Sequence, residues 1–189
     1  MAVGRILIYA LILFEALNLA GILNFTLDFS WLGLLVTSVG TLLALEMIYF
    51  IFQRKRILLP QLPYLLAAAG LWLDALGDIA HLYGRLGFYD QFMHAVGGGI
   101  VMALAIAILS NTKAKMPVVL IIFLALGLVA LFGDLYEIEE YLEDRFYHGR
   151  QVRLGDGPDT ADDLLWNLAG GMLVGTVYLI KKWREKTSS

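Results

Sequence analysis

The chain has 189 residues, of which 59% are hydrophobic and only 16% are charged, and its formal net charge is -3. Soluble domains carry about 25% charged residues, so this composition excludes an ordinary soluble domain. The absence of cysteine excludes a disulfide framework and a thiolate metal site. No basic patch with interleaved aromatic residues is present, so nucleic acid is not an expected partner.

Long apolar runs recur along the whole chain. A bilayer-spanning helix needs about 20 mostly apolar residues, and several runs meet this length. The first run lacks a small-residue cleavage pattern, which favours a retained span over a signal peptide. We predict an all-α, polytopic transmembrane bundle in a single domain, 1–189, located in the cell membrane with about six spans: 5–23, 31–52, 62–82, 90–110, 117–141 and 160–181.

Two of these spans carry specific start signals. Pro60 and Pro63 suit the start of the third helix, because proline is tolerated in a first helical turn. Asp159 or Thr160 is expected to cap the N-terminus of the last helix.

The basic residues alternate between loops. They cluster at Arg5, at 54–56, at 113–115 and in the C-terminal tail, whereas the third and fifth loops hold only four arginines. The positive-inside rule then places both termini in the cytoplasm and the odd-numbered loops outside.

Four of the predicted helices carry acidic or imidazole side chains near their outer ends, at a similar depth. Ionisable groups inside spans cost about 2.5–3.5 kcal/mol each at the helix centre, so each needs a reason. Glu15 and Glu46 stand alone near the middle of the first two spans. The grouped residues follow helical spacings: Asp74, Asp78 and His81; Asp90 and His94; Asp134 and Glu137; Asp159, Asp163 and Asn167.

Carboxylates gathered in a region of low dielectric need protons, basic groups or a cation to compensate them. Ligand pairs spaced i, i+3 or i, i+4 on facing helices are the geometry of metal sites in helical bundles. We therefore expect a divalent metal ion, with Mg, Mn, Zn and non-haem Fe all open. The predicted ligands are Asp90, His94, Asp134, Glu137 and Asp163, and of these His94, Glu137 and Asp163 are the candidate catalytic residues. Around them lies a wider polar site, in which His81 is a further ligand or a proton-transfer base: Asp74, Asp78, His81, Asp159 and Asn167.

Simpler interpretations compete with a metal site. Asp90 and Asp159 could only cap helix N-termini, and the glycines of 97–99 and 170–175 could only serve close helix packing. The arginines of the fifth loop could pair with the acids and leave no room for a metal. Alternatively that loop, roughly 143–159, could cover the site as a lid whose arginines bind a phosphate or carboxylate.

Three segments in the second half of the chain carry a family resemblance: YDQFMHAVGGG, GDLYEIEEYLED and DGPDTADDLLWNLAGG. They resemble the signature blocks of the YjdF-like family of predicted inner-membrane proteins and are distantly similar to VanZ-like proteins. The resemblance covers Tyr89 to Gly175, and Asp134 matches none of its motif residues. It implies an extracytoplasmic site near lipid headgroups but names no reaction. The matched positions are Asp90, His94, Glu137, Asp159, Asp163, Asn167 and Gly170.

Three functions follow as hypotheses. The first is a metal-dependent membrane hydrolase or transferase acting on a lipid or lipid-linked substrate. The second is a cation or proton transporter or channel, which would need Glu15 or Glu46 in a path joined to the outer cluster. The third is a non-catalytic, lipid-binding scaffold whose polar groups tie helices together. Membrane lipids are the expected partners, and no feature fixes an oligomeric state.

Overall fold

The structure, a computed structural model, describes residues 2–57, 61–112 and 114–187, which therefore exclude Pro60. Helices joined by short loops make up this part of the chain, and it contains no strand. In chain order the helices are α1 (Ala2–Leu19), α2 (Trp31–Arg54), α3 (Leu62–Ile79), α4 (Leu82–Arg85), α5 (Tyr89–Ser110), α6 (Val118–Glu143), the π-helical turn η1 (Asp144–His148) and α7 (Gly157–Thr187).

Among the described residues, five helices are long and apolar enough to cross a bilayer: α2, α3, α5, α6 with η1, and α7. Their lipid-compatible surfaces carry exposed side chains such as Phe123 and Leu173. The predictions of an all-helical fold and of a multi-pass membrane protein are confirmed. The 18-residue α1 is not one of the five, so a count of six spans remains a prediction.

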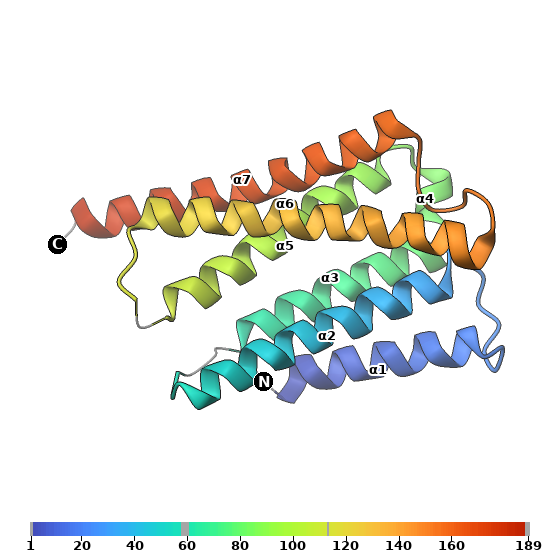
Figure 1. The fold of residues 1–189 in the computed structure, drawn as a ribbon, viewed down its shortest axis with the longest axis horizontal. Helices are drawn as coiled ribbons and strands as arrows, with labels where there is room; N and C mark the ends of the chain where they lie inside the picture. Colours follow the sequence, from blue (N-terminus) through green and yellow to red (C-terminus); the bar gives the residue numbers. More distant parts are fainter. Residues whose placement is uncertain (1, 58–60, 113, 188–189) are drawn as a thin grey trace.

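The helices form two groups of three, α1–α3 and α5–α7, which lie side by side (Figure 1). Each group has its own apolar core, the first around Tyr64 and Ile8 and the second around Met102 and Val129. The groups meet where α3 contacts α5 and where α2 contacts α6.

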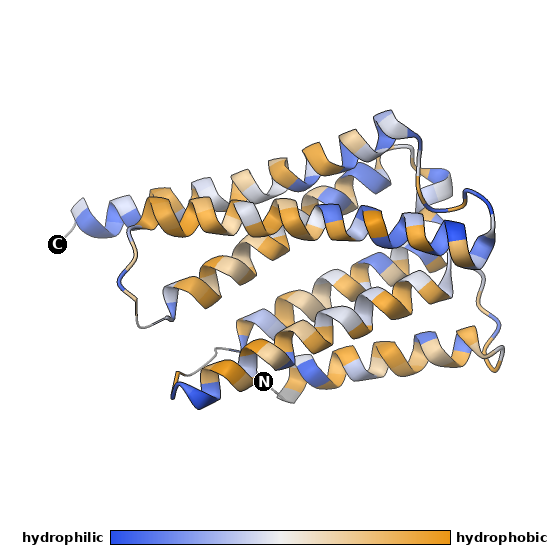
Figure 2. Cartoon of the chain, viewed as in Figure 1, coloured by the Kyte–Doolittle hydropathy of each residue, from blue (hydrophilic) through white to orange (hydrophobic). Residues whose placement is uncertain are grey.

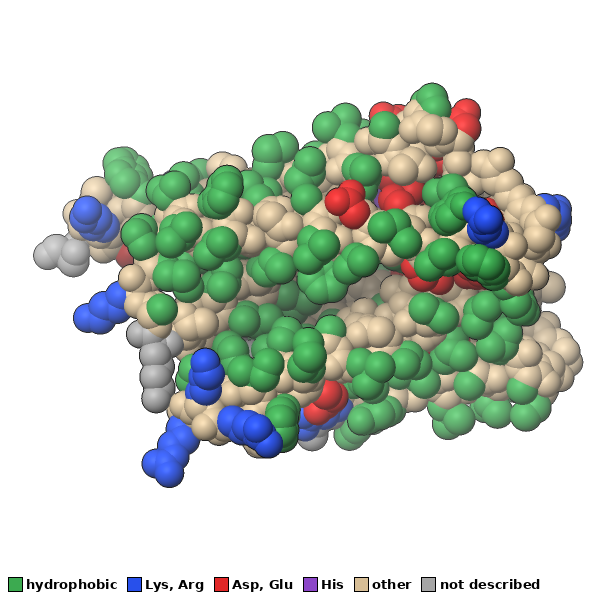
Figure 3. All heavy atoms as spheres, viewed as in Figure 1, with side chains coloured by type: hydrophobic (Ala, Val, Ile, Leu, Met, Phe, Trp, Pro, Cys, Tyr) green, Lys and Arg blue, Asp and Glu red, His purple; other side chains and the backbone are tan. Residues whose placement is uncertain are grey.

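Both chain ends and the α2–α3 and α5–α6 connections lie at one end of the bundle (Figure 1). Lysine and arginine side chains gather at this end in Figure 3, and hydrophilic residues mark both ends of the bundle in Figure 2. The opposite end holds the other three connections. This arrangement agrees with the charge-based topology, although the side that faces the cytoplasm stays a prediction.

Two helix boundaries differ from the predicted spans for local backbone reasons. α1 ends at Leu19 because Gly21 takes a left-handed conformation, with φ of 70°. α3 ends at Ile79, and His81 follows with φ of 57°, so His81 does not continue the helical face of the third span.

The predicted cap of the last helix was wrong. α7 begins at Gly157, before both Asp159 and Thr160. The Asp156 carboxylate accepts a hydrogen bond from the backbone N–H of Asp159 at 3.2 Å, so Asp156 satisfies the first turn.

Candidate functional site

Close packing of α5 against α7 brings the candidate ligands together. A side chain at Gly98 would overlap the backbone of Asn167, and one at Gly170 would overlap the backbone of Ala95. These glycines therefore allow an approach that residues with a Cβ would prevent. The expectation that they serve helix packing is confirmed, and their packing sets the distance between His94 and Asp163.

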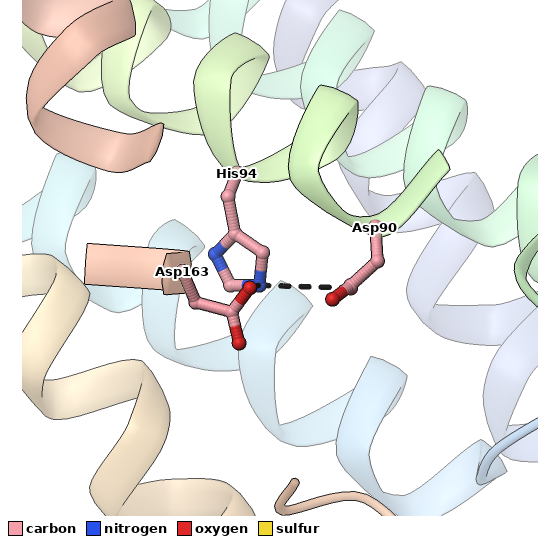
Figure 4. Close-up of side chains that lie close together, drawn as sticks. All are labelled: Asp90, His94 and Asp163. Atoms are coloured by element: carbon pink, nitrogen blue, oxygen red, sulfur yellow. Dashed lines mark ion pairs between the residues drawn. The ribbon is translucent and has the colours of Figure 1, made fainter. Parts of the chain in front are cut away.

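Asp90 and His94 from α5 point toward Asp163 from α7 (Figure 4). Nε2 of His94 lies 3.4 Å from Oδ1 of Asp163 and 3.6 Å from Oδ1 of Asp90. One ligand atom from each of the three residues lies within 4.8 Å of the others, and Asp163 is buried. Three of the five predicted metal ligands therefore form one group.

The other ring nitrogen of His94 contacts Asn167, whose Nδ2 lies 3.3 Å from Nδ1. The imidazole also packs edge-on against the ring of Tyr136, with centroids 5.9 Å apart. His94 is thus held on two sides, and its Nε2 is directed at the two carboxylates.

Two buried carboxylates near this group lack hydrogen-bond partners within the described part of the chain. They are Oδ1 of Asp163 and both oxygens of Glu137, which has the Thr160 side chain nearby but not in hydrogen-bond geometry. Buried polar atoms are almost always paired, and exceptions call for an explanation such as an ion or a catalytic role. Glu137 is only 6% exposed, so water does not compensate it freely.

Asp134 does not join the group. It lies on the exposed face of α6, between exposed Leu131 and Leu135, while Glu137 one turn later is buried. Because Asp134 and Glu137 are three residues apart, they project from the helix in directions that differ by about 60°. The packing of α6 turns the Glu137 side towards the interior and leaves Asp134 exposed. Asp159 is half-buried in the first turn of α7.

Asp78 and His81 hold the first loop against α3. Oδ1 of Asp78 accepts hydrogen bonds from the backbone N–H groups of Asp28 and Phe29 at 2.7 and 3.1 Å. Nδ1 of His81 pairs with Asp28 at 2.8 Å, and its Nε2 lies 3.1 Å from the Thr26 hydroxyl. Both ring nitrogens of His81 are therefore engaged, which argues against its expected role as a metal ligand or proton-transfer base.

Sequence reasoning missed Asp28. Its carboxylate contacts His81 and accepts a hydrogen bond from the backbone N–H of Gly84 at 2.8 Å. No helical spacing links a residue of the first loop to residues 81–84, and only the tertiary arrangement joins them.

Asp74 is paired with a tyrosine that sequence reasoning also missed. The Tyr83 hydroxyl donates to Oδ1 of Asp74 at 2.5 Å. Burial raises the pKa of the Tyr83 phenol, so this group stays protonated and acts as a donor.

Arg153 is the centre of a second charged cluster. Nη1 lies 2.7 Å from Glu139 and 2.9 Å from Glu143, and Nη2 lies 3.2 Å from Glu140. Nη2 also donates to the Tyr136 hydroxyl at 3.0 Å. Burial acts to lower the pKa of the guanidinium, but Tyr136 and the glutamates raise it, and the net shift is upward. Arg153 is therefore a fixed cation.

For Arg153 this cluster favours the other expectation, that the arginines of the fifth loop pair with acids of the protein. The Arg153 side chain is 4% exposed and is fully engaged with glutamates of α6. The same pairing leaves Asp90 and Asp163 without an arginine among their ion-pair partners in the described residues.

Hydrogen bonds hold the fifth loop against the end of α6. The Asp144 carboxylate accepts the backbone N–H groups of Val152, Arg153 and Leu154, at 2.9 to 3.1 Å. His148 contacts Glu143 at 2.9 Å. The loop thus packs over the end of the bundle that lies opposite the chain termini.

A cavity of about 240 Å³ lies between the two helix groups and reaches both charged clusters. In Figure 3 the surface is hollowed between α2 and α6, the two helices that line this side of the cavity. The polar residues in its wall include Asp74, Asp78, Asp90, His94, Tyr136, Glu140, Arg153 and Asn167.

Glu15 and Glu46 make their contacts away from this cavity. Glu46 pairs with Arg5, at 2.5 and 2.7 Å, and accepts from the Tyr64 hydroxyl at 3.1 Å. Glu15 is fully buried; its Oε1 accepts a hydrogen bond from Ser38 at 3.0 Å, and its Oε2 has no hydrogen-bond partner within the described residues. Neither glutamate lines the cavity, so the structure does not connect them to the outer cluster.

Comparisons with known proteins place the chain in a family. Neither the curated proteins nor the solved structures yield a match. One family model, described as a predicted membrane protein family (DUF2238), matches residues 5–184. The match extends well beyond the segments that carry the resemblance and supports a membrane-protein family, without confirming the YjdF-like or VanZ-like names. The chain therefore belongs to the DUF2238 family of predicted membrane proteins.

Proposed function

We propose that this integral membrane protein is a metal-dependent hydrolase or transferase that acts on a lipid or lipid-linked substrate at the outer membrane surface. The observation that carries the proposal is the spacing around Nε2 of His94, 3.4 Å to Asp163 and 3.6 Å to Asp90. These separations exceed the 2.7–3.2 Å of an N–H···O hydrogen bond. Ligand atoms held about 2.1 Å from a tetrahedral ion lie about 3.4 Å apart, so the spacing suits a shared cation.

Burial supports the same interpretation. Asp163 has a buried oxygen without a hydrogen-bond partner within the described residues, directed toward His94. A divalent ion would compensate two carboxylates that no arginine neutralises, and carboxylate and imidazole ligands suit Mg, Mn, Zn or Fe. Such an ion would supply Lewis-acid chemistry to a carbonyl or phosphoryl oxygen.

Each side chain then has a distinct part. Asp90, His94 and Asp163 would hold the ion, and Asn167 would orient the imidazole through Nδ1. Glu137 is a buried carboxylate with no partner in the described structure, which suits a general base that accepts a proton from an attacking water.

The transport alternative has less support. A transport path needs polar groups through the full thickness of the bilayer. Glu15 and Glu46, the two acids nearest the middle of the first spans, face Ser38 and Arg5 rather than the cavity.

Metal analysis of the purified protein tests the proposal. We expect close to one equivalent of a divalent metal in the wild type, and loss of it in His94→Ala and Asp163→Ala. Asp134→Ala is the matched control, because Asp134 is exposed on the same bundle and should leave metal content unchanged. Less than about a tenth of an equivalent in the wild type after exposure to Mg, Mn, Zn and Fe would refute a metal site.

A further inference from the structure

The cavity is long and narrow. On α5 its lining residues run from Asp90 to Leu104, a distance of about 21 Å at 1.5 Å per residue. Its volume of about 240 Å³ lies below the roughly 300–1,000 Å³ of pockets that enclose drug-sized ligands. A cavity this small and this long is a slot along the bundle axis.

The two ends of the slot differ in chemistry. At the outer end α5 contributes Asp90 and His94, and deeper in the bundle it contributes Ile100 and Leu104. The antiparallel α3 shows the same gradient in reverse chain order, with its aspartates at the outer end and Gly70, Leu71 and Ala67 at the inner end. The lining residues of both antiparallel helices therefore give the slot one polar end and one apolar end.

The slot is also accessible from the membrane side. Phe132 of α6 lines the cavity and is 44% exposed, so it stands at the rim. The hollow between α2 and α6 lies on this face (Figure 3). A molecule already in the bilayer could enter sideways with its chain in hydrocarbon throughout, and hydrocarbon chains are the ligands that apolar cavities accept.

We infer that the slot binds the single hydrocarbon chain of an amphiphile whose oxygen-bearing head lies against the Asp90–His94–Asp163 group. The position of the head group rests on the proposed function. The position of the chain rests on the shape of the cavity alone. The slot has room for one chain, so the second acyl chain of a diacyl lipid would have to stay in the bilayer outside the opening. The favoured substrate class is therefore a lysolipid or another single-chain amphiphile, which leaves no chain outside the slot.

Gly70 offers a way to block the slot. It lines the inner end, and a Cβ placed there meets only the terminal methyl of Ile100, at 2.7 Å. A leucine at this position would project into the space that the chain needs. Gly40 of α2 provides the matched control, because a Cβ there meets nothing within 4 Å and Gly40 does not line the cavity.

The test uses the full chain in phosphatidylcholine nanodiscs with a long-chain lysophosphatidic acid that carries a diazirine near the end of its chain. After photolysis, peptide mass spectrometry should find labels on the slot wall, at Gly70, Leu71, Ile100 and Leu104. Gly70→Leu should lower this labelling about tenfold, since overpacking of that size disfavours the bound chain. Gly40→Leu should label like the wild type. A diacyl phosphatidic acid with the same chain should label the wall less than the lysolipid, because its second chain must stay outside the slot.

Leu104→Trp provides a second block, should Gly70→Leu fail to fold. Its control is Leu43→Trp, on an exposed position of α2. Equal wall labelling in blocked and control variants would overturn the inference. Labelling confined to residues on the lipid-exposed surface, such as Phe123, would also overturn it. Repeating the experiment with a chelator separates the two proposals. Wall labelling that persists without metal would support chain binding in the slot even if metal analysis has refuted the metal site.

Discussion

Nδ1 of His94 lies 3.3 Å from the Asn167 amide, and therefore Nε2 is the nitrogen that faces Asp90 and Asp163. In the structure the Asn167 Nδ2 group faces Nδ1. For Nε2 to bind a cation, the ring proton must sit on Nδ1, and the Asn167 amide must turn by 180° so that its oxygen accepts that proton. The contact between these two residues thus sets the tautomer on which the proposed metal site depends.

Asn167→Leu should weaken metal binding by about 10- to 100-fold, the usual effect of removing a group that orients a metal-binding histidine. Asn167→Asp should retain binding, because a carboxylate accepts the Nδ1 proton at least as well. Calorimetric metal titration measures both variants. An unchanged affinity in Asn167→Leu would show that Asn167 does not orient His94.

Glu137→Gln and Glu143→Gln should have opposite effects on the stability of the metal-free protein. Both glutamates are 6% exposed on the same helix, but Glu143 contacts Arg153 and His148, whereas neither oxygen of Glu137 has a partner in the described residues. Removing an uncompensated charge from Glu137 should raise the unfolding free energy by about 1–3 kcal/mol. Glu143→Gln should lower it. Thermal unfolding in detergent measures the stability of each variant relative to the wild type.

The same pair separates an enzyme from a scaffold. A protein whose polar groups serve only to tie helices together should be destabilised by both substitutions. A stabilising Glu137→Gln would indicate a carboxylate retained at a cost to stability, as groups at functional sites often are.

Arg153→Met should destabilise the fold by about 3–5 kcal/mol, because it leaves three glutamates of α6 close together without their cation. Arg150→Met, on an exposed position of the same loop, should change stability by less than about 0.5 kcal/mol. Adding Glu139→Gln and Glu143→Gln to Arg153→Met should recover part of the loss. Similar melting temperatures for the two single variants would contradict the central role of Arg153.

Asp78→Ala should lower stability by about 1–3 kcal/mol, since it leaves the backbone N–H groups of Asp28 and Phe29 unpaired. Asp78→Asn keeps an acceptor oxygen and should cost less. Neither variant should alter metal content, which elemental analysis of the purified proteins checks. Loss of metal in Asp78→Asn would show that Asp78 contributes to the metal site.

The membrane class, the helix positions and the approximate depth of the polar residues follow from the sequence by itself. The reason is that the bilayer acts on each helix separately, so the length and polarity of one segment decide whether it can span. Asp90, His94 and Asp163 could be named as candidate ligands, together with Asp134 and Glu137, because all five recur at helical spacings near helix ends predicted to share one side of the membrane.

The tertiary structure decided which of these side chains face one another. Asp134 and Glu137 differ by less than one helical turn, yet only Glu137 is buried, because the packing of α6 against its neighbours fixes the rotation of the helix about its axis. The pairing of Asp28 with His81 and of Arg153 with three glutamates joins segments with no periodic relation. Such contacts depend on how loops fold over helix ends, and local sequence patterns carry no information about that.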